Sequence, residues 1–131
     1  MKSLFLALAM FAGSTVFAGQ VELGKYRATD VDTKTIIADL ELRANGTANL
    51  MIKTPDFSMP APGCEGTYKI QGNKFTANVK CPTDILPEAS VAIDVTNVNP
   101  QSVRSPEGAR VDVIIDALGE EATTFMLKKK D

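Results

Sequence analysis

The sequence predicts an all-β domain, an eight-stranded antiparallel up-and-down β-barrel, with a two-sheet β-sandwich as the alternative. Three observations support this class. Apolar and polar residues alternate in short segments along the chain, turn residues separate these segments, and no segment sustains helical spacing. Eight consecutive strands with one apolar face each can close on themselves and so remove their own edges. The expected strands are 22–29, 34–43, 47–54, 64–71, 74–81, 90–97, 109–116 and 122–129.

Residues 1–18 have the features of a Sec-type signal peptide. Lys2 precedes an apolar run from Leu4 to Ala12, and Val16-Phe17-Ala18 provides small residues before a cut after Ala18. The run is too short to span a bilayer, and no second membrane segment follows. We therefore expect a periplasmic or secreted protein whose single domain covers residues 19–131.

The composition excludes several classes of function. The chain of 131 residues has a formal net charge of −2 and no histidine. Without imidazole, catalysis by a histidine base and histidine-ligated metal sites are excluded. The charge balance gives no global basic field, so we expect no nucleic-acid partner.

The first three strands follow from alternation and turn chemistry. Gly24, Tyr26 and Ala28 share one face of the first strand. The second and third strands flank residues 43–47, where a three-residue turn with Gly46 in the left-handed conformation pairs only apolar residues with one another. The expected pairs are 42 with 48, 40 with 50 and 38 with 52, and the inward face of the second strand begins at Ile36.

The next hairpin predicts a disulfide between Cys64 and Cys81. Gly72-Asn73 is typical of a two-residue hairpin loop that sets Gln71 against Lys74. Counting outward from that pair brings the two cysteines opposite each other at a non-hydrogen-bonded position, where α-carbons lie about 4.5 Å apart. An even number of cysteines in an exported chain is consistent with this pairing.

The last three strands place valine, isoleucine, phenylalanine and leucine on their inward faces. Three connections are longer: 55–63, 82–89 and 98–108, all rich in proline. In a regular meander the first two lie at the same rim and the third lies at the opposite rim. Phe57, Met59, Ile85 and Leu86 are therefore expected to cluster at one mouth of the barrel.

With the strands placed, the chain resembles the lipocalin-like barrels of the calycin group that occur as small bacterial envelope proteins. The resemblance rests on Gly24-Lys25-Tyr26 in the first strand, on residues 40–47 and on residues 64–70. It implies an exported barrel that binds a small ligand.

No motif predicts catalysis, a metal or a cofactor. The acidic pairs Asp30/Asp32, Asp112/Asp116 and Glu120/Glu121 fall at strand ends or on polar faces, which is typical of solvated side chains. Asp30-Val31-Asp32 lacks the remaining ligands and the glycine of a calcium loop. Met51, Met59 and Met126 are interpreted as packing residues rather than copper ligands. Lys128–Lys130 is interpreted as a solvated tail, with contact to acidic surfaces as the alternative.

Two hypotheses for function follow. In the first, a non-enzymatic monomer binds a small apolar ligand in its interior or at one mouth, which requires an internal cavity of several hundred Å³. In the second, an interaction or inhibitor module binds an envelope protein through the loop 55–63, unless Phe57 and Met59 fold inward as a plug. The candidate binding residues are Tyr26, Phe57, Met59, Ile85 and Leu86.

Overall fold

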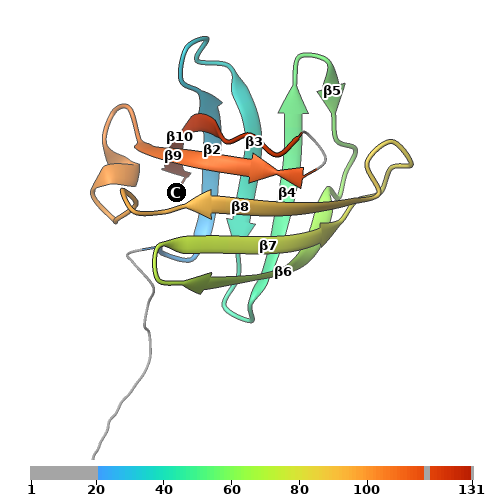
Figure 1. Ribbon diagram of the computed structural model, residues 1–131, viewed down its shortest axis with the longest axis horizontal. Coiled ribbons are helices and arrows are strands. Elements are labelled where there is room, and N and C mark those ends of the chain that lie inside the picture. The colour runs from blue at the N-terminus through green and yellow to red at the C-terminus, as the bar shows by residue number, and fades with distance from the viewer. Residues whose placement is uncertain (1–20, 117–118, 131) are drawn as a thin grey trace, which may run out of the picture.

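The computed structural model describes residues 21–116 and 119–130, so the signal peptide expected at residues 1–18 lies outside the described residues. The described chain consists of β-strands and one short 3-10 helix (Figure 1). The elements are β2 (Gly24–Asp30), β3 (Ile36–Leu42), β4 (Thr47–Thr54), β5 (Phe57–Ser58), β6 (Cys64–Gln71), β7 (Lys74–Lys80), β8 (Glu88–Asp94), η1 (Ser102–Arg104), β9 (Ala109–Ile115) and β10 (Thr123–Lys130).

The strands form a closed antiparallel barrel, which confirms the first prediction over the sandwich. Eight strands follow one another around the wall, and the two-residue β5 pairs only with the end of β4. Closure comes from β10, which pairs with β2 from Phe125↔Asp30 to Lys130↔Lys25. Because every main strand has a neighbour on both sides, the wall has no free edge.

The two hairpins have the registers that the sequence predicts. Leu42 pairs with Ala48 and Leu40 with Leu50, and Gly46 has the left-handed φ of 81° that the three-residue turn requires. In the next hairpin Gln71 pairs with Lys74, and this register continues to Glu65↔Lys80. The pairing ends at the predicted disulfide, where the α-carbons of Cys64 and Cys81 are 4.1 Å apart.

A β-bulge in β3 changes one prediction about the inward face. The register between β2 and β3 shifts after Ala28↔Ala38, so that Thr29 pairs with Ile36 and Ile37 is the extra residue. Ile36, expected to point inward, is exposed, whereas Ile37 packs against the core. The expectation for Ile36 was wrong because alternation reverses at a bulge.

The antiparallel wall has two rims, which we call upper and lower. The upper rim carries the β2–β3, β4–β6, β7–β8 and β9–β10 connections, so 55–63 and 82–89 share a rim as expected. The lower rim carries the two tight hairpin turns and the β8–β9 connection. The start of β2 and the end of β10 also lie at this rim. Val98 and Val103 of the β8–β9 connection are buried, and η1 contacts β9 and β10, so this connection covers the lower end of the barrel.

Strand limits differ from expectation mainly around β8. The strand expected at 90–97 begins at Glu88 and ends at Asp94, although Val95 stays buried as the alternation predicts. The connection 55–63 contains β5, which alternation did not reveal. Within the described residues, no helix is long and apolar enough to cross a membrane.

Candidate functional site

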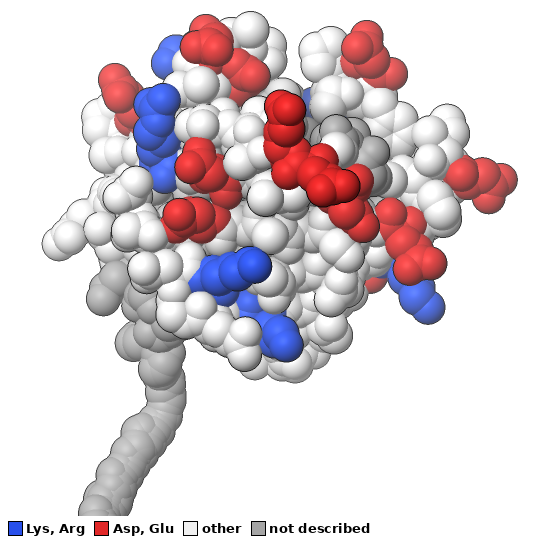
Figure 2. Space-filling view, in the orientation of Figure 1, with Lys and Arg blue, Asp and Glu red and all other residues white. Residues whose placement is uncertain are grey.

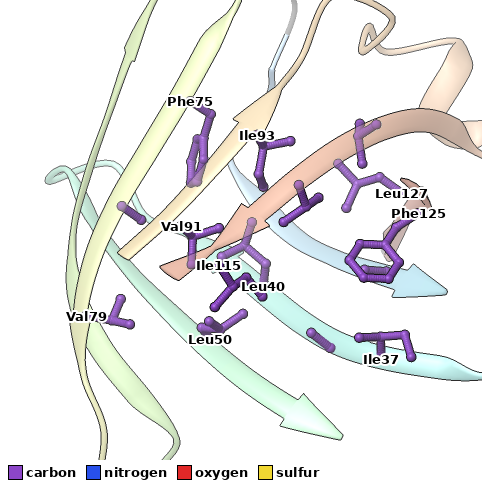
Figure 3. A pocket seen from close by; sticks show the side chains of 15 residues that line it. Ile37, Leu40, Leu50, Phe75, Val79, Val91, Ile93, Ile115, Phe125 and Leu127 are labelled. Carbon is purple, nitrogen blue, oxygen red and sulfur yellow. The ribbon is translucent and has the colours of Figure 1, made fainter. Parts of the chain in front are cut away.

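The barrel encloses a cavity whose walls are entirely apolar (Figure 3). Its volume is about 50 Å³. In Figure 3 side chains from strands on different sides of the wall point toward this common space. The lining residues are Ala28, Ile37, Ala38, Leu40, Leu50, Phe75, Ala77, Val79, Val91, Ile93, Val111, Val113, Ile115, Phe125 and Leu127.

The cavity is much smaller than the several hundred Å³ expected for a preformed ligand chamber. An eight-stranded barrel is only just wide enough for its inward side chains to fill it. Here the large side chains of Phe75, Phe125 and Leu50 enter the lumen from different strands and are buried there. The remaining space accommodates part of an apolar molecule, not a whole drug-sized ligand.

The two ends of the lumen differ in their access to solvent. At the lower end Tyr26, Val98 and Val103 are almost completely buried. Near the upper rim Ile37 and Ile115 line the cavity and are only partly buried. The upper rim is therefore the mouth through which an apolar group reaches the cavity.

The upper rim is acidic. Its connections and the strand ends beside them carry Asp30, Asp32, Asp56, Asp84, Glu88, Asp116, Glu120 and Glu121. Figure 2 shows acidic side chains over the upper and right-hand part of the visible face, where these connections lie in Figure 1. The carboxylates that form ion pairs in the described part of the chain are Glu22, Asp39, Glu41 and Glu65, and none of these belongs to the upper rim.

Asp30 is a rim carboxylate on the inward face of the barrel, next to the cavity. It pairs with Phe125, a cavity-lining residue, and shares the inward face of β2 with Ala28. The backbone N–H groups of Thr33 and Asp32 donate to its carboxylate at 3.0 and 2.8 Å. These bonds hold the pKa of Asp30 below its usual value, so the group is ionised at neutral pH.

Met59 and Phe57, two of the predicted binding residues, pack against the barrel. Met59 is 5% exposed, its N–H donates to the carbonyl of Ile52 at 2.8 Å, and its Sδ lies 3.9 Å from Sγ of Cys64. Phe57 pairs with Thr54 in the short β4–β5 hairpin and is partly buried. Met59 therefore fills the wall beside the disulfide, as the plug alternative describes, and neither residue lines the cavity.

The remaining predicted residues do not gather at one site. Ile85 is 82% exposed, whereas its neighbour Leu86 packs against the core. Tyr26 lies at the opposite end of the barrel, 1% exposed, and its hydroxyl donates to the carbonyl of Glu22 at 2.6 Å. None of the five predicted binding residues lines the cavity.

Tyr26 makes stability sensitive to alkaline pH. Burial raises the pKa of Tyr26 to about 12, because the charged phenolate loses its hydration. The folded state therefore retains the phenolic proton that the unfolded chain releases near pH 10. The contribution of this protonated phenol to the free energy of unfolding is fully present below pH 10. It is lost as the pH rises toward 12, which lowers the free energy of unfolding by roughly 2 kcal/mol.

The Tyr26→Phe variant tests this coupling. At neutral pH we expect the variant to lose about 1 kcal/mol, because the buried hydrogen bond to Glu22 is removed. At pH 12 we expect it to equal or exceed the wild type, because phenylalanine does not ionise. Urea unfolding across this range measures both; a constant difference between the two proteins would contradict the role of Tyr26.

Alternation placed most of the cavity lining on inward faces, and the interior was one of the expected binding places, but none of the lining residues was among the candidate binding residues. The alternation placed Leu40, Leu50, Val91, Val113 and Phe125 on inward faces. It missed Ile37, because only the bulge turns this residue inward. Most of the candidate binding residues were expected in the proline-rich connections, whereas the residues that line the cavity all lie in strands.

The described part of the chain offers little for metal binding. No group of three or more cysteine, aspartate or glutamate side chains in it is placed to hold an ion. Asp112 accepts a hydrogen bond from Thr124 and Asp116 accepts one from the N–H of Ser90, so these carboxylates have local structural partners.

Comparisons with protein-family models, curated proteins and solved structures found no match.

Proposed function

We propose that this protein is a non-enzymatic, exported barrel that binds a small apolar ligand at its upper mouth, with one end of the ligand inside the lumen. The observation that carries the proposal is the cavity lining, which contains no polar residue. Such a surface gains free energy by excluding water from an apolar group and offers no group for acid–base or nucleophilic chemistry. The Cys64–Cys81 disulfide supports export, because such bonds persist in oxidising compartments.

The size of the lumen determines how the ligand binds. A cavity of about 50 Å³ accepts the end of an alkyl chain or a comparable group. The rest of the ligand lies at the mouth, against the partly exposed side chains of Ile37 and Ile115. The acidic rim disfavours ligands with a carboxylate or phosphate at this position, so the proposed ligand is neutral or cationic there.

A neutral alkyl alcohol tests the proposal. We expect 1-decanol to shift the methyl NMR signals of Ile37, Ile115 and Val113, which line the cavity. Ala77→Val adds two methyl-sized groups inside the cavity and should weaken decanol binding at least tenfold, by roughly 1.4 kcal/mol. The same variant should keep or slightly raise the melting temperature, because it fills empty space.

Ala92→Val is the matched control for this experiment. Ala92 lies on β8 opposite Thr76, on the outer face of the wall next to β7. The same substitution there leaves the lumen unchanged, so decanol should bind as to the wild type. Shifts confined to the outer face, or equal binding by the Ala77→Val variant, would overturn the proposal.

One observation favours a second candidate function, an envelope protein-interaction or inhibitor module. Ile85 is exposed at 82% on a connection held by the disulfide at Cys81 and stiffened by Pro82 and Pro87. The contact would then use 82–87 rather than 55–63, where Met59 is buried. Pull-downs of envelope proteins with the wild type and Ile85→Ala test this candidate; equal recovery of every partner would rule it out.

A further inference from the structure

The outer surface of β2 and β10 carries four cationic side chains near the lower rim: Lys25, Arg27, Lys128 and Lys130. We call this group the basic face. In the antiparallel register Lys130 lies directly opposite Lys25, and Lys128 lies directly opposite Arg27. Like charges at directly opposed positions destabilise a sheet. The fold therefore contains two pairs of opposed cations that disfavour it. The alternation of apolar and polar residues requires only a polar residue at these four positions, not a charged one.

The last lysines are part of the barrel rather than a solvated tail. The sequence predicts a solvated tail at Lys128–Lys130, but β10 extends to Lys130 and pairs with β2 along its whole lower half. Lys129 faces the other side of the strand, with its Nζ 5.7 Å from the centre of the Tyr26 ring. The strand pairing therefore places Lys128 and Lys130 on the outer surface of the barrel.

Neighbouring carboxylates neutralise only part of this charge. Asp39 binds Arg27 at 2.9 Å, but it also binds Lys53 at 2.9 Å, so one carboxylate serves two cations. The Nζ of Lys128 donates to the carbonyl of Pro106, which carries no charge. The basic face therefore keeps a net positive charge.

Lys25 also has a carboxylate beside it, but that carboxylate is shared. Glu41 lies opposite Lys25 on the β3 side, and it binds Arg43 at 3.3 Å. Arg43 in turn binds Glu65 at 2.8 Å. Glu41, Arg43 and Glu65 together carry a net charge of −1, which offsets only one of the two opposed lysines, Lys25 and Lys130.

We propose that the basic face docks the protein on an anionic lipid surface. Lysine and arginine stems reach across an interface while their charged ends meet lipid phosphates. Leu23, 49% exposed and two residues before Lys25, supplies an apolar side chain beside the cations. The acidic upper rim is repelled by the same surface, so the protein docks with the mouth of the cavity directed away from the lipid.

Vesicle flotation tests the docking. We expect the protein to float with phosphatidylcholine vesicles that contain phosphatidylglycerol as about a third of the lipid, and not with pure phosphatidylcholine vesicles. Binding should disappear at about 0.5 M NaCl, where screening acts within a few Å. The Lys25→Gln/Lys130→Gln double variant should bind the anionic vesicles about 30-fold more weakly. Each lysine near an anionic lipid surface strengthens binding about fivefold to sixfold, and the double variant loses two of them.

A matched variant and a stability measurement separate binding from folding. Lys69→Gln/Lys74→Gln removes the same charge from β6 and β7, on the opposite side of the barrel, and should bind as the wild type. The Lys25→Gln/Lys130→Gln variant should melt at the same or a higher temperature, because it relieves a repulsion. Equal loss of binding in both variants, or binding to soluble polyphosphate but not to anionic vesicles, would overturn the proposal.

Discussion

Removal of the Cys64–Cys81 disulfide is expected to lower the free energy of unfolding by about 3 kcal/mol. The bond closes a loop between residues 17 positions apart, and this loop contains the whole β6–β7 hairpin. Without it the unfolded chain gains conformational freedom that the folded chain does not. For a domain of this size the loss corresponds to a fall in melting temperature of roughly 13 °C. Urea unfolding of the Cys64→Ala/Cys81→Ala variant measures it.

A reducing agent provides the internal control. Reduction should destabilise the wild type by a similar amount and leave the double variant unchanged, because the variant has no bond to reduce. The bond also joins the start of β6 to the end of β7 at the upper rim, beside the buried Met59. If the double variant unfolds at the same urea concentration as the oxidised wild type, the disulfide does not stabilise the fold.

The wall of the barrel could be predicted from the sequence because it depends on local rules. Alternation assigns each residue to a face, and a tight turn fixes the register of the strands on both sides of it. Two such turns gave the pairing of Leu42 with Ala48 and of Cys64 with Cys81 correctly. Closure between β2 and β10 was inferred from the number of strands alone, and the structure shows it directly.

The site was harder to predict because its properties depend on distances across the barrel. Alternation shows that Phe75 and Phe125 point inward, but not how far their rings fill the lumen. The bulge that turns Ile37 inward leaves no turn residue or proline in the sequence. Proline-rich connections suggested exposed binding loops, yet the backbone of Met59 bonds to Ile52 and its side chain is buried.

Gly66→Ala is expected to destabilise the barrel by about 3 kcal/mol, at the upper end of the usual cost of overpacking. Gly66 lies on β6 between Ala48 of β4 and Val79 of β7. A β-carbon built on Gly66 would lie 2.6 Å from the α-carbon of Val79 and 2.8 Å from the carbonyl carbon of Asn78. Both are backbone atoms, so no side-chain rotation relieves the clash and the strands must move apart.

Gly72→Ala separates this clash from the ordinary cost of replacing glycine. Gly72 has a left-handed φ of 60°, but a β-carbon there would meet nothing within 4 Å. We expect a loss of about 1 kcal/mol from backbone strain alone. Gly66 carries no left-handed strain, so a larger loss at Gly66 than at Gly72 in urea unfolding can come only from the close approach of β6 and β7. A smaller loss at Gly66 than at Gly72 would show that β6 and β7 separate at little cost and would contradict the expected clash.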